Sequence, residues 1–338
     1  MKKKILLCLL CVIILFSFSG CQNRLNRYQA GFMDLFDTAT MIIGYEPNQE
    51  KFNQTVNKIH EGMQEYHELY DLYHEYEGKA NLRTINLHPG EPVKVDQKII
   101  DLLLFAKEIS EASGGKTDVT LGSVLSLWHD AREAGIADPE NAFLPDESEL
   151  KAAAGHTGFE NIEINTEEKT VYLKDPMLRL DVGAIAKGYA VQKICDTIPT
   201  GYLLSVGGNV YATGPKGDGK EWIVGVQDPN GGLNDYVRTV SLRAGAVVTS
   251  GDYQRTYTVD GTAYHHIIDP ETLYPGKLWR SVTIRHPDSG VADALSTTLF
   301  LSDREQGEAL LQKYGASAMW IDQSGNIFYS SGFEEAQD

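Results

Sequence analysis

The stretch 181–189, with the sequence Asp-Val-Gly-Ala-Ile-Ala-Lys-Gly-Tyr, constrains the fold of this chain more than any other segment. It follows the apolar residues 177–180, and the pattern predicts a strand that runs directly into a helix. Amide groups at a helix start carry partial positive charge and suit a phosphate, and Gly183 lets a ligand approach the backbone closely. The stretch therefore suggests a phosphate site that includes Asp181 and Lys187. The alternative is that Asp181 only caps the helix and Lys187 is a solvated charge.

The N-terminus resembles an export signal. Lysines at 2–4 precede an apolar run over 5–18 that is too short for a membrane-spanning helix. Small residues then lead to Cys21, as in bacterial lipoproteins, whose signal is removed before a lipid-modified cysteine. We expect a signal peptide over 1–20, lipidation of Cys21 and a tether over 21–31, which would anchor an exported protein to the outer face of the cytoplasmic membrane, or place it in a periplasm. A plain signal peptide or a signal anchor is the alternative.

Composition narrows the class of protein. With Cys21 lipidated, Cys195 is the one cysteine left after the signal, so the sequence supports neither a disulfide framework nor a cysteine metal site. The formal net charge of −17 argues against nucleic acid as a partner, because binding it needs clustered Lys and Arg. No linker divides residues 32–338, and we expect one folded domain there.

Hydrophobic periodicity predicts an α+β fold. Apolar and aromatic residues recur at spacings of three and four between Phe52 and Tyr73, which indicates a long amphipathic helix whose stripe packs in the core. Asp260-Gly261 between two short alternating runs indicates a hairpin. Further helices are expected over 98–112, 184–197, 292–301 and 305–314, and mostly antiparallel strands over 162–164, 170–173, 257–259, 262–264, 319–321 and 326–329.

Asp293 and Thr297 form a second candidate site. On a helix, residues four apart lie on one face, so the carboxylate and the hydroxyl would be neighbours. Two hard oxygen ligands suit Mg²⁺, which completes its shell with water and substrate phosphates. A cap plus a buried hydroxyl is the alternative explanation.

The histidine pair His265-His266 follows the predicted hairpin. In a strand, adjacent side chains point to opposite faces, so at most one of the two serves a site. Histidine is well suited to take a proton from a hydroxyl nucleophile, although a surface coincidence is the alternative. Glycine turns at 205–209 and 250–253 carry little information by themselves.

Taken in this order, these segments resemble the flavin transferases of the ApbE family, which move FMN from FAD onto a protein threonine or serine. The resemblance spans residues 32–330 and implies a single ApbE-like, T-fold-related domain. It departs from the family pattern at Phe36-Asp37, where the family has a Met-Gly-Thr-like segment, and at 271–276. The matching segments are 118–122 with Leu127-Trp128, 181–189, 205–209, 250–253, 266–270 and 292–300.

The resemblance implies a Mg²⁺-dependent reaction that makes a phosphoester link and releases AMP. Mg²⁺ would be held by Asp293, Thr297 and the carbonyl of Ala184. His266, Asp293 and Lys187 would be the catalytic residues, with Asp269 fixing the His266 ring or the loop. Contacts to FAD are expected from Phe36, Asp118, Thr120, Asp181, Lys187, Gly208, Gly251, Asp252, His266 and Ile267.

Two other functions stay open. A Mg²⁺-dependent FAD pyrophosphatase would use the same site with water in place of the acceptor hydroxyl. A lipid-anchored flavin-binding protein without turnover would need no metal. The expected partners of the transferase are FAD and an extracytoplasmic acceptor flavoprotein that offers a Thr or Ser.

Overall fold

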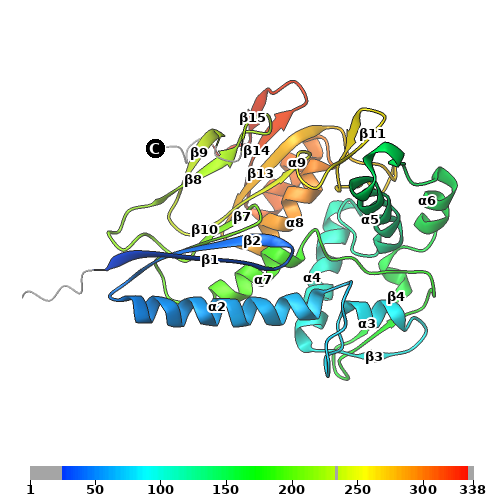
Figure 1. Ribbon diagram of the computed structural model, residues 1–338, viewed down its shortest axis with the longest axis horizontal. Coiled ribbons are helices and arrows are strands. Elements are labelled where there is room, and N and C mark those ends of the chain that lie inside the picture. The colour runs from blue at the N-terminus through cyan, green and yellow to red at the C-terminus, as the bar shows by residue number, and fades with distance from the viewer. Residues whose placement is uncertain (1–24, 233–234, 334–338) are drawn as a thin grey trace, which may run out of the picture.

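An eight-stranded sheet runs through the centre of the molecule, and every pairing in it is antiparallel (Figure 1). The computed structural model describes residues 25–232 and 235–333. The predicted signal peptide and Cys21 lie outside the described residues. In spatial order the strands are β1 (Asn26–Leu35), β2 (Thr38–Glu46), β6 (Tyr202–Val206), β7 (Asn209–Ala212), β10 (Gly245–Gly251), β13 (Trp279–His286), β14 (Ser317–Asp322) and β15 (Ile327–Tyr329).

The sheet is buried on both faces because its inner strands alternate between two cores. In β10, Val248 packs toward α8 (Ser289–Phe300) and α9 (Arg304–Tyr314), whereas its neighbour Val247 packs toward the ribbon of β8 (Trp222–Gln227) and β9 (Tyr236–Leu242). Successive side chains of a strand point to opposite faces, so apolar residues at consecutive positions supply both layers. Helices therefore cover one face and the β8–β9 ribbon the other.

The long helix predicted from the aromatic stripe is α2 (Gln49–Tyr70), which lies along the sheet beneath β1 and β2 (Figure 1). Asn48 caps it by accepting a hydrogen bond from the amide of Lys51 at 3.0 Å. The stripe packs in the core as expected, but the helix ends at Tyr70, so the prediction that Tyr73 belongs to it is wrong. Residues 26–31 belong to β1, so the prediction that the tether extends to residue 31 is wrong. Alternate side chains in this part of β1 pack against α2.

Most of the remaining predicted elements are present. The helix over 98–112 is α4 (Gln97–Ser113), and it ends at Gly114 in the left-handed conformation. The hairpin at Asp260-Gly261 joins β11 (Tyr257–Val259) and β12 (Thr262–Tyr264). The other elements are α3 (Leu82–Leu87), α5 (Gly122–Ala137), α6 (Glu147–Ala154), α7 (Ala186–Cys195), the 3₁₀ turns η1 (Pro139–Asn141) and η2 (Phe159–Asn161), and a small sheet of β3 (Val93–Lys94), β5 (Thr170–Leu173) and β4 (Ile162–Asn165).

The segment 177–180 differs from its prediction, because it is no strand that runs into a helix. Arg179 makes one isolated bridge with Leu121, and α7 begins only at Ala186. The Leu180 amide donates to the Asn86 side chain at 2.8 Å and the Leu180 carbonyl accepts from it at 2.9 Å. A distant side chain thus satisfies the backbone that a neighbouring strand would otherwise pair. Within the described ranges, no helix combines the length and apolar character needed to cross a membrane.

Candidate functional site

The first turn of α7 packs unusually closely against α8. A Cβ on Gly188 would lie 2.3 Å from the Cβ of Asp293 and 2.4 Å from the carbonyl oxygen of Ser289, so only glycine fits. The Gly188 amide donates to Asp293 Oδ2 at 2.7 Å. Gly188 is the third residue of α7, so its amide is one of the first N–H groups, which have no acceptor within the helix. The Asp293 carboxylate satisfies this amide and joins α7 to α8.

This arrangement fits the ligand set that the resemblance implies for Mg²⁺. Asp293 is buried, yet among the described residues its carboxylate accepts only the Gly188 hydrogen bond. Thr297 lies one turn further along the same face of α8 and is half-buried. The described part of the chain contains no group of three or more His, Cys, Asp or Glu that could hold a metal. A site built here would have one carboxylate, one hydroxyl and one carbonyl, which is the sparse oxygen set that Mg²⁺ tolerates.

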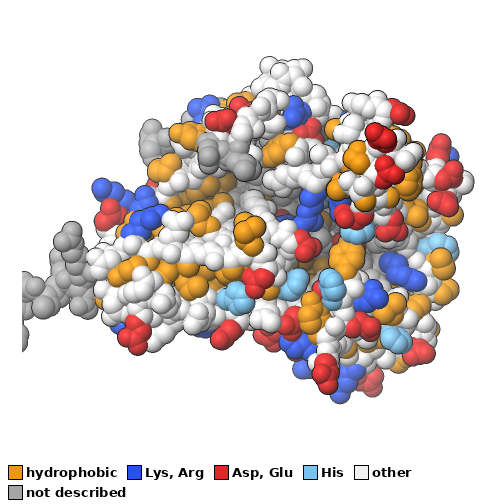
Figure 2. Space-filling view, in the orientation of Figure 1, with side chains coloured by type: hydrophobic (Ala, Val, Ile, Leu, Met, Phe, Trp, Pro, Cys, Tyr) orange, Lys and Arg blue, Asp and Glu red, His pale blue; other side chains and the backbone are white. Residues whose placement is uncertain are grey.

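Asp181 lies in the wall of a cleft of about 240 Å³. Its Oδ1 accepts from the Gly183 amide at 2.8 Å, and since α7 starts later, the alternative that Asp181 caps the helix is wrong. Burial raises the pKa of Asp181, and positive charge on His129, Arg255 and Arg132 opposes that rise. On the face drawn in Figure 2, acidic, basic and histidine side chains gather around the hollow in the right half of the molecule.

The two histidines have different surroundings. His265 is buried: its Nε2 donates to the Gly276 carbonyl at 2.8 Å, and its Nδ1 accepts from the Ile267 amide at 3.2 Å. Both ring nitrogens are therefore used within the fold. His266 Nδ1 donates to the Gln254 carbonyl at 3.2 Å, which places the lone pair of the neutral ring on Nε2. At most one histidine of the pair is free for chemistry, as expected, and it is His266.

Cations surround His266. Burial, and then the charges of Arg255, His265 and Lys187, together lower the pKa of His266 to about 3, against the hydrogen bond to Gln254, which raises it. The His266 ring is consequently neutral near pH 7. Arg255 is exposed and has a φ of 47°, a conformation that side chains rarely adopt. Lys187 and Arg255 thus place positive charge beside the imidazole in a chain whose net charge is strongly negative.

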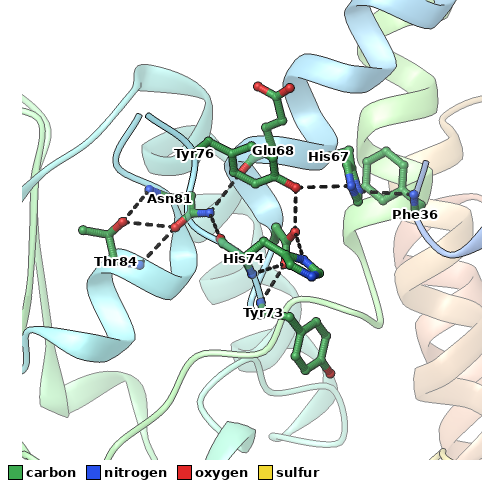
Figure 3. Close-up of polar contacts among 9 residues, drawn as sticks. Phe36, His67, Glu68, Tyr73, His74, Tyr76, Asn81 and Thr84 are labelled. Carbon is green, nitrogen blue, oxygen red and sulfur yellow. Dashed lines mark hydrogen bonds and ion pairs between the residues drawn. The ribbon is translucent and has the colours of Figure 1, made fainter. Parts of the chain in front are cut away.

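Phe36 lies in the turn between β1 and β2, where Phe36 and Asp37 have φ values of 54° and 50°. The Phe36 amide donates to His67 Nδ1 at 3.2 Å, and the two rings meet edge to face at 5.5 Å (Figure 3). Gly208, in the β6–β7 turn, has a φ of 93° that favours glycine. A Cβ on Gly251 would lie 2.4 Å from the Tyr253 ring.

Several predicted site residues are occupied by structural contacts. Thr120 is fully buried, and its hydroxyl accepts from the Gly158 amide at 2.7 Å. Asp252 receives a hydrogen bond from Arg280 at 3.0 Å. Asp118 accepts from the Thr120 amide at 2.8 Å, and burial raises the pKa of Asp118. The Ile267 side chain lies in the core beneath α8.

Asp269 fixes a loop and not the His266 ring. Its Oδ1 accepts from Lys116 Nζ at 3.2 Å and from the Glu271 amide at 3.0 Å. Lys116 also pairs with the Glu271 carboxylate at 3.0 Å. The loop over 271–276, where the sequence departs from the family pattern, is thereby held against the end of α4.

Sequence reasoning missed Tyr73 and His129, which line the cleft, and Arg132, which contacts His129. Tyr73 stacks on His129 with ring centroids 4.9 Å apart, and both line the cleft that contains Asp181. Arg132 donates to His129 Nδ1 at 3.0 Å. The sequence analysis assigned Tyr73 to the core, because Tyr73 continues the spacing of the aromatic stripe. His129 and Arg132 follow Leu127-Trp128 on α5, and their position directly after a segment that resembles the family was the available signal.

Comparisons with known proteins agree on one family. The model of the ApbE family matches residues 36–320. The FAD:protein FMN transferase of Treponema pallidum (strain Nichols) is 35% identical over 271 residues, which is 74% of this chain and 73% of that protein. The protein of that name from Escherichia coli (strain K12) is 28% identical over 244 residues, or 70% of this chain and 68% of that protein.

Solved structures extend the likeness to the fold. The ApbE protein from Thermotoga maritima matches with a TM-score of 0.82 at 31% identity, over 93% of this chain and 100% of that chain. The flavin transferase ApbE from Vibrio cholerae matches with a TM-score of 0.76 at 24% identity, over 92% and 99%. They confirm the predicted mixed α+β fold with mostly antiparallel strands. Because the family model matches most of the sequence and a relative is 35% identical over 74% of it, this chain belongs to the ApbE family.

Proposed function

We propose that this protein is an enzyme that transfers FMN from FAD to a Thr or Ser hydroxyl of an acceptor protein. The relatives that bear the name FAD:protein FMN transferase support the reaction class. The observation that carries the proposal within this chain is the contact between α7 and α8, where the buried carboxylate of Asp293 lies one helical turn from the hydroxyl of Thr297. These hard oxygen atoms, with the Ala184 carbonyl as the third ligand that we propose, suit a cation that binds phosphate.

We assign the residues near the contact between α7 and α8 separate roles in phosphoryl transfer. The acceptor hydroxyl oxygen forms a bond to the phosphorus on the FMN side of FAD, and the bond from that phosphorus to the bridging oxygen breaks. AMP leaves with the bridging oxygen. Nε2 of His266, kept unprotonated by the Gln254 contact at Nδ1, takes the proton of the hydroxyl. Lys187 holds a phosphate oxygen by charge, as cations do in phosphoryl transfer.

Asp293, Thr297 and the carbonyl of Ala184 would hold Mg²⁺, which neutralises phosphate charge as the transition state forms. Asp293 has a second task, since it also accepts from the Gly188 amide. Its carboxylate therefore joins α7 to α8 through Oδ2, which would leave Oδ1 available to hold the cation. Asp181 lies in the cleft wall and is half-buried, so its carboxyl would contact the nucleotide there.

We further propose that the protein works outside the cytoplasm. The signal over 1–20 and Cys21 support export and lipid anchoring, which would keep the folded domain beside membrane-bound redox proteins. The acceptor would be an exported or membrane-bound flavoprotein that presents its Thr or Ser on an accessible segment. The chain begins its first strand at Asn26, only five residues after the proposed lipid site.

The test combines two substitutions of aspartate. Asp293→Asn keeps an oxygen for the Gly188 amide but removes the charge, and Asp101→Asn, on the exposed face of α4, is the matched control. Purified protein, FAD, Mg²⁺ and a Thr-bearing acceptor domain are incubated, and flavin fluorescence on the denatured acceptor is read beside AMP release. We expect wild type and Asp101→Asn to label the acceptor, and Asp293→Asn to lose about a hundredfold in rate or more.

Other results would indicate a different function or contradict the proposed metal ligands. AMP and free FMN without labelling, with several Thr-bearing acceptors, would identify a pyrophosphatase. FAD binding without AMP would leave a binding protein. Labelling that EDTA does not reduce, or full activity of Asp293→Asn, would contradict the metal assignment.

A further inference from the structure

We propose that His67 and Asp71 are positioning residues that hold two segments beside the proposed FAD site in one fixed arrangement, the Phe36-Asp37 turn (first wall) and Tyr73 (second wall). Of the two, Tyr73 lines the cleft that contains Asp181. The inference rests on the proposed function, because it assigns the cleft to FAD. Neither residue belongs to the segments that resemble the family motifs. His67 lies in the last turn of α2, and Asp71 is the C-cap residue, directly after the last helical residue, Tyr70.

The first wall is a turn that needs external support. Phe36 and Asp37 both have left-handed φ values, and neither is glycine. Such a conformation costs of the order of a kcal/mol per residue and persists only where surrounding contacts fix it. His67 supplies that contact twice, since its Nδ1 accepts the Phe36 amide and its ring meets the Phe36 ring.

The second wall is fixed through the carboxylate of Asp71, which is buried. Asp71 Oδ1 accepts from the amides of Tyr73 at 2.6 Å and His74 at 3.1 Å. Asp71 Oδ2 accepts from the Tyr76 hydroxyl at 2.7 Å and lies 2.9 Å from His74 Nδ1. Burial pushes the pKa of Asp71 up, but these hydrogen bonds outweigh it and hold the pKa below its ordinary value. The backbone at Tyr73 is thus tied to an ionised carboxylate.

Tyr76 connects the two walls. Because Nδ1 of His67 accepts from Phe36, the ring proton is on Nε2, which lies 3.5 Å from the Tyr76 oxygen. The Tyr76 hydroxyl in turn donates to Asp71. Figure 3 shows this series, from the Phe36 backbone through His67 and Tyr76 to the loop that bears Tyr73, whose ring points away from the network.

The ring of Tyr73 reaches the cleft. It stacks on His129 and lines the cleft with Asp181. Burial is the main cause that raises the pKa of Tyr73 to about 12, and the nearby negative charges of Asp181 and Asp37 also raise it. Asp37, from the first wall, therefore lies near Tyr73, from the second. Loss of the His67 contact would let the two walls move relative to one another, and preorganisation for FAD would fall.

The experiment measures FAD affinity in four proteins. His67→Ala removes the acceptor for the Phe36 amide, His67→Asn restores an acceptor oxygen close to the place of Nδ1, and His60→Ala is the matched control. His60 lies on the same helix and pairs with Asp34 of β1 at 2.9 Å, but it does not touch the turn. The dissociation constant for FAD is measured by equilibrium titration, and KM and kcat by acceptor labelling.

We expect His67→Ala to raise the FAD dissociation constant and KM about tenfold, the size of one hydrogen bond, with kcat within about threefold of wild type. His67→Asn should recover most of that loss, and His60→Ala should match wild type. An unchanged dissociation constant in His67→Ala, or no recovery in His67→Asn, would overturn the proposal.

Two provisions keep the result interpretable. If His67→Ala does not fold, Tyr76→Phe replaces it; we expect a loss of about threefold in FAD affinity, and no loss would overturn the proposal. If wild type binds FAD but does not label an acceptor, the proposed function fails, while the comparison of dissociation constants still tests the positioning role.

Discussion

Asp293 accepts a hydrogen bond that joins two helices, and it is also a proposed ligand of Mg²⁺. Asp293→Ala would leave the buried Gly188 amide without an acceptor, whereas Asp293→Asn would not. We expect the alanine variant to be less stable than the asparagine variant by about 1–3 kcal/mol, the cost of an unsatisfied buried amide. Urea denaturation of both variants measures the difference. Equal stabilities would show that the Gly188 contact contributes little to folding.

His266 leads to a prediction about acid. Its pKa is lowered from 6.5 in the unfolded chain to about 3 in the folded one, first by burial and then by Arg255 and neighbouring cations. Between these values the unfolded state binds the extra proton, so this group destabilises the fold as pH falls below 6.5, by at most about 1.4 kcal/mol per pH unit. His266→Gln cannot take up that proton.

The free energy of unfolding, measured at pH 7, 6 and 5, should therefore fall less steeply in His266→Gln than in wild type. Parallel curves would mean that the buried imidazole does not contribute to acid sensitivity. The same variant should also lose transfer activity at pH 7, since it has no basic nitrogen to accept the acceptor proton.

At the scale of elements, short sequence patterns predicted correctly the ends and turns that depend only on local backbone geometry. Gly114 ends α4, and Asp260-Gly261 turns between β11 and β12, because each needs only its own backbone geometry. The segment 177–180 was predicted as a strand because apolar residues alone do not reveal that Asn86 would satisfy its backbone. Tyr73 continues the helical spacing in the sequence, but the helix ends at Tyr70.

The α7–α8 contact is the element on which the candidate site depends most. Gly188→Ala would force a methyl group into the Asp293 Cβ and the Ser289 carbonyl, and backbone atoms cannot move aside cheaply. We expect a loss of about 1–3 kcal/mol in stability, the usual cost of overpacking, together with a loss of Mg²⁺-dependent activity. Thermal unfolding and AMP release measure the two effects.

Gly155→Ala is the matched control, because Gly155 ends α6 at a φ of −68° that alanine adopts easily. It should be as stable and as active as wild type. A Gly188→Ala protein that resembles this control in both measurements would show that α7 and α8 can separate without consequence.

At the scale of the whole molecule, the proposed site would combine segments that are distant in the sequence. The Phe36 turn, the cleft residue Asp181, His266 and the α8 residue Asp293 come from four different regions of the chain. Motifs identified most of these regions, since each carries a recognisable local pattern. Which side chains face the cleft follows from packing, so Thr120 and Ile267 proved to be buried while Tyr73 and His129 were missed.

A site assembled from distant segments should couple ligand binding to global stability. A ligand that binds only the folded state at about a hundred times its dissociation constant adds about 2.7 kcal/mol, which would raise Tm by about 5 °C in a chain of this size. We expect FAD with Mg²⁺ to produce a shift of about this size, and FAD with EDTA a smaller one, because phosphate charge then stays uncompensated beside Asp293. In Asp293→Asn the two shifts should be equal. Scanning fluorimetry of both proteins measures them, and a wild-type shift that EDTA leaves intact would mean that FAD binds without the metal.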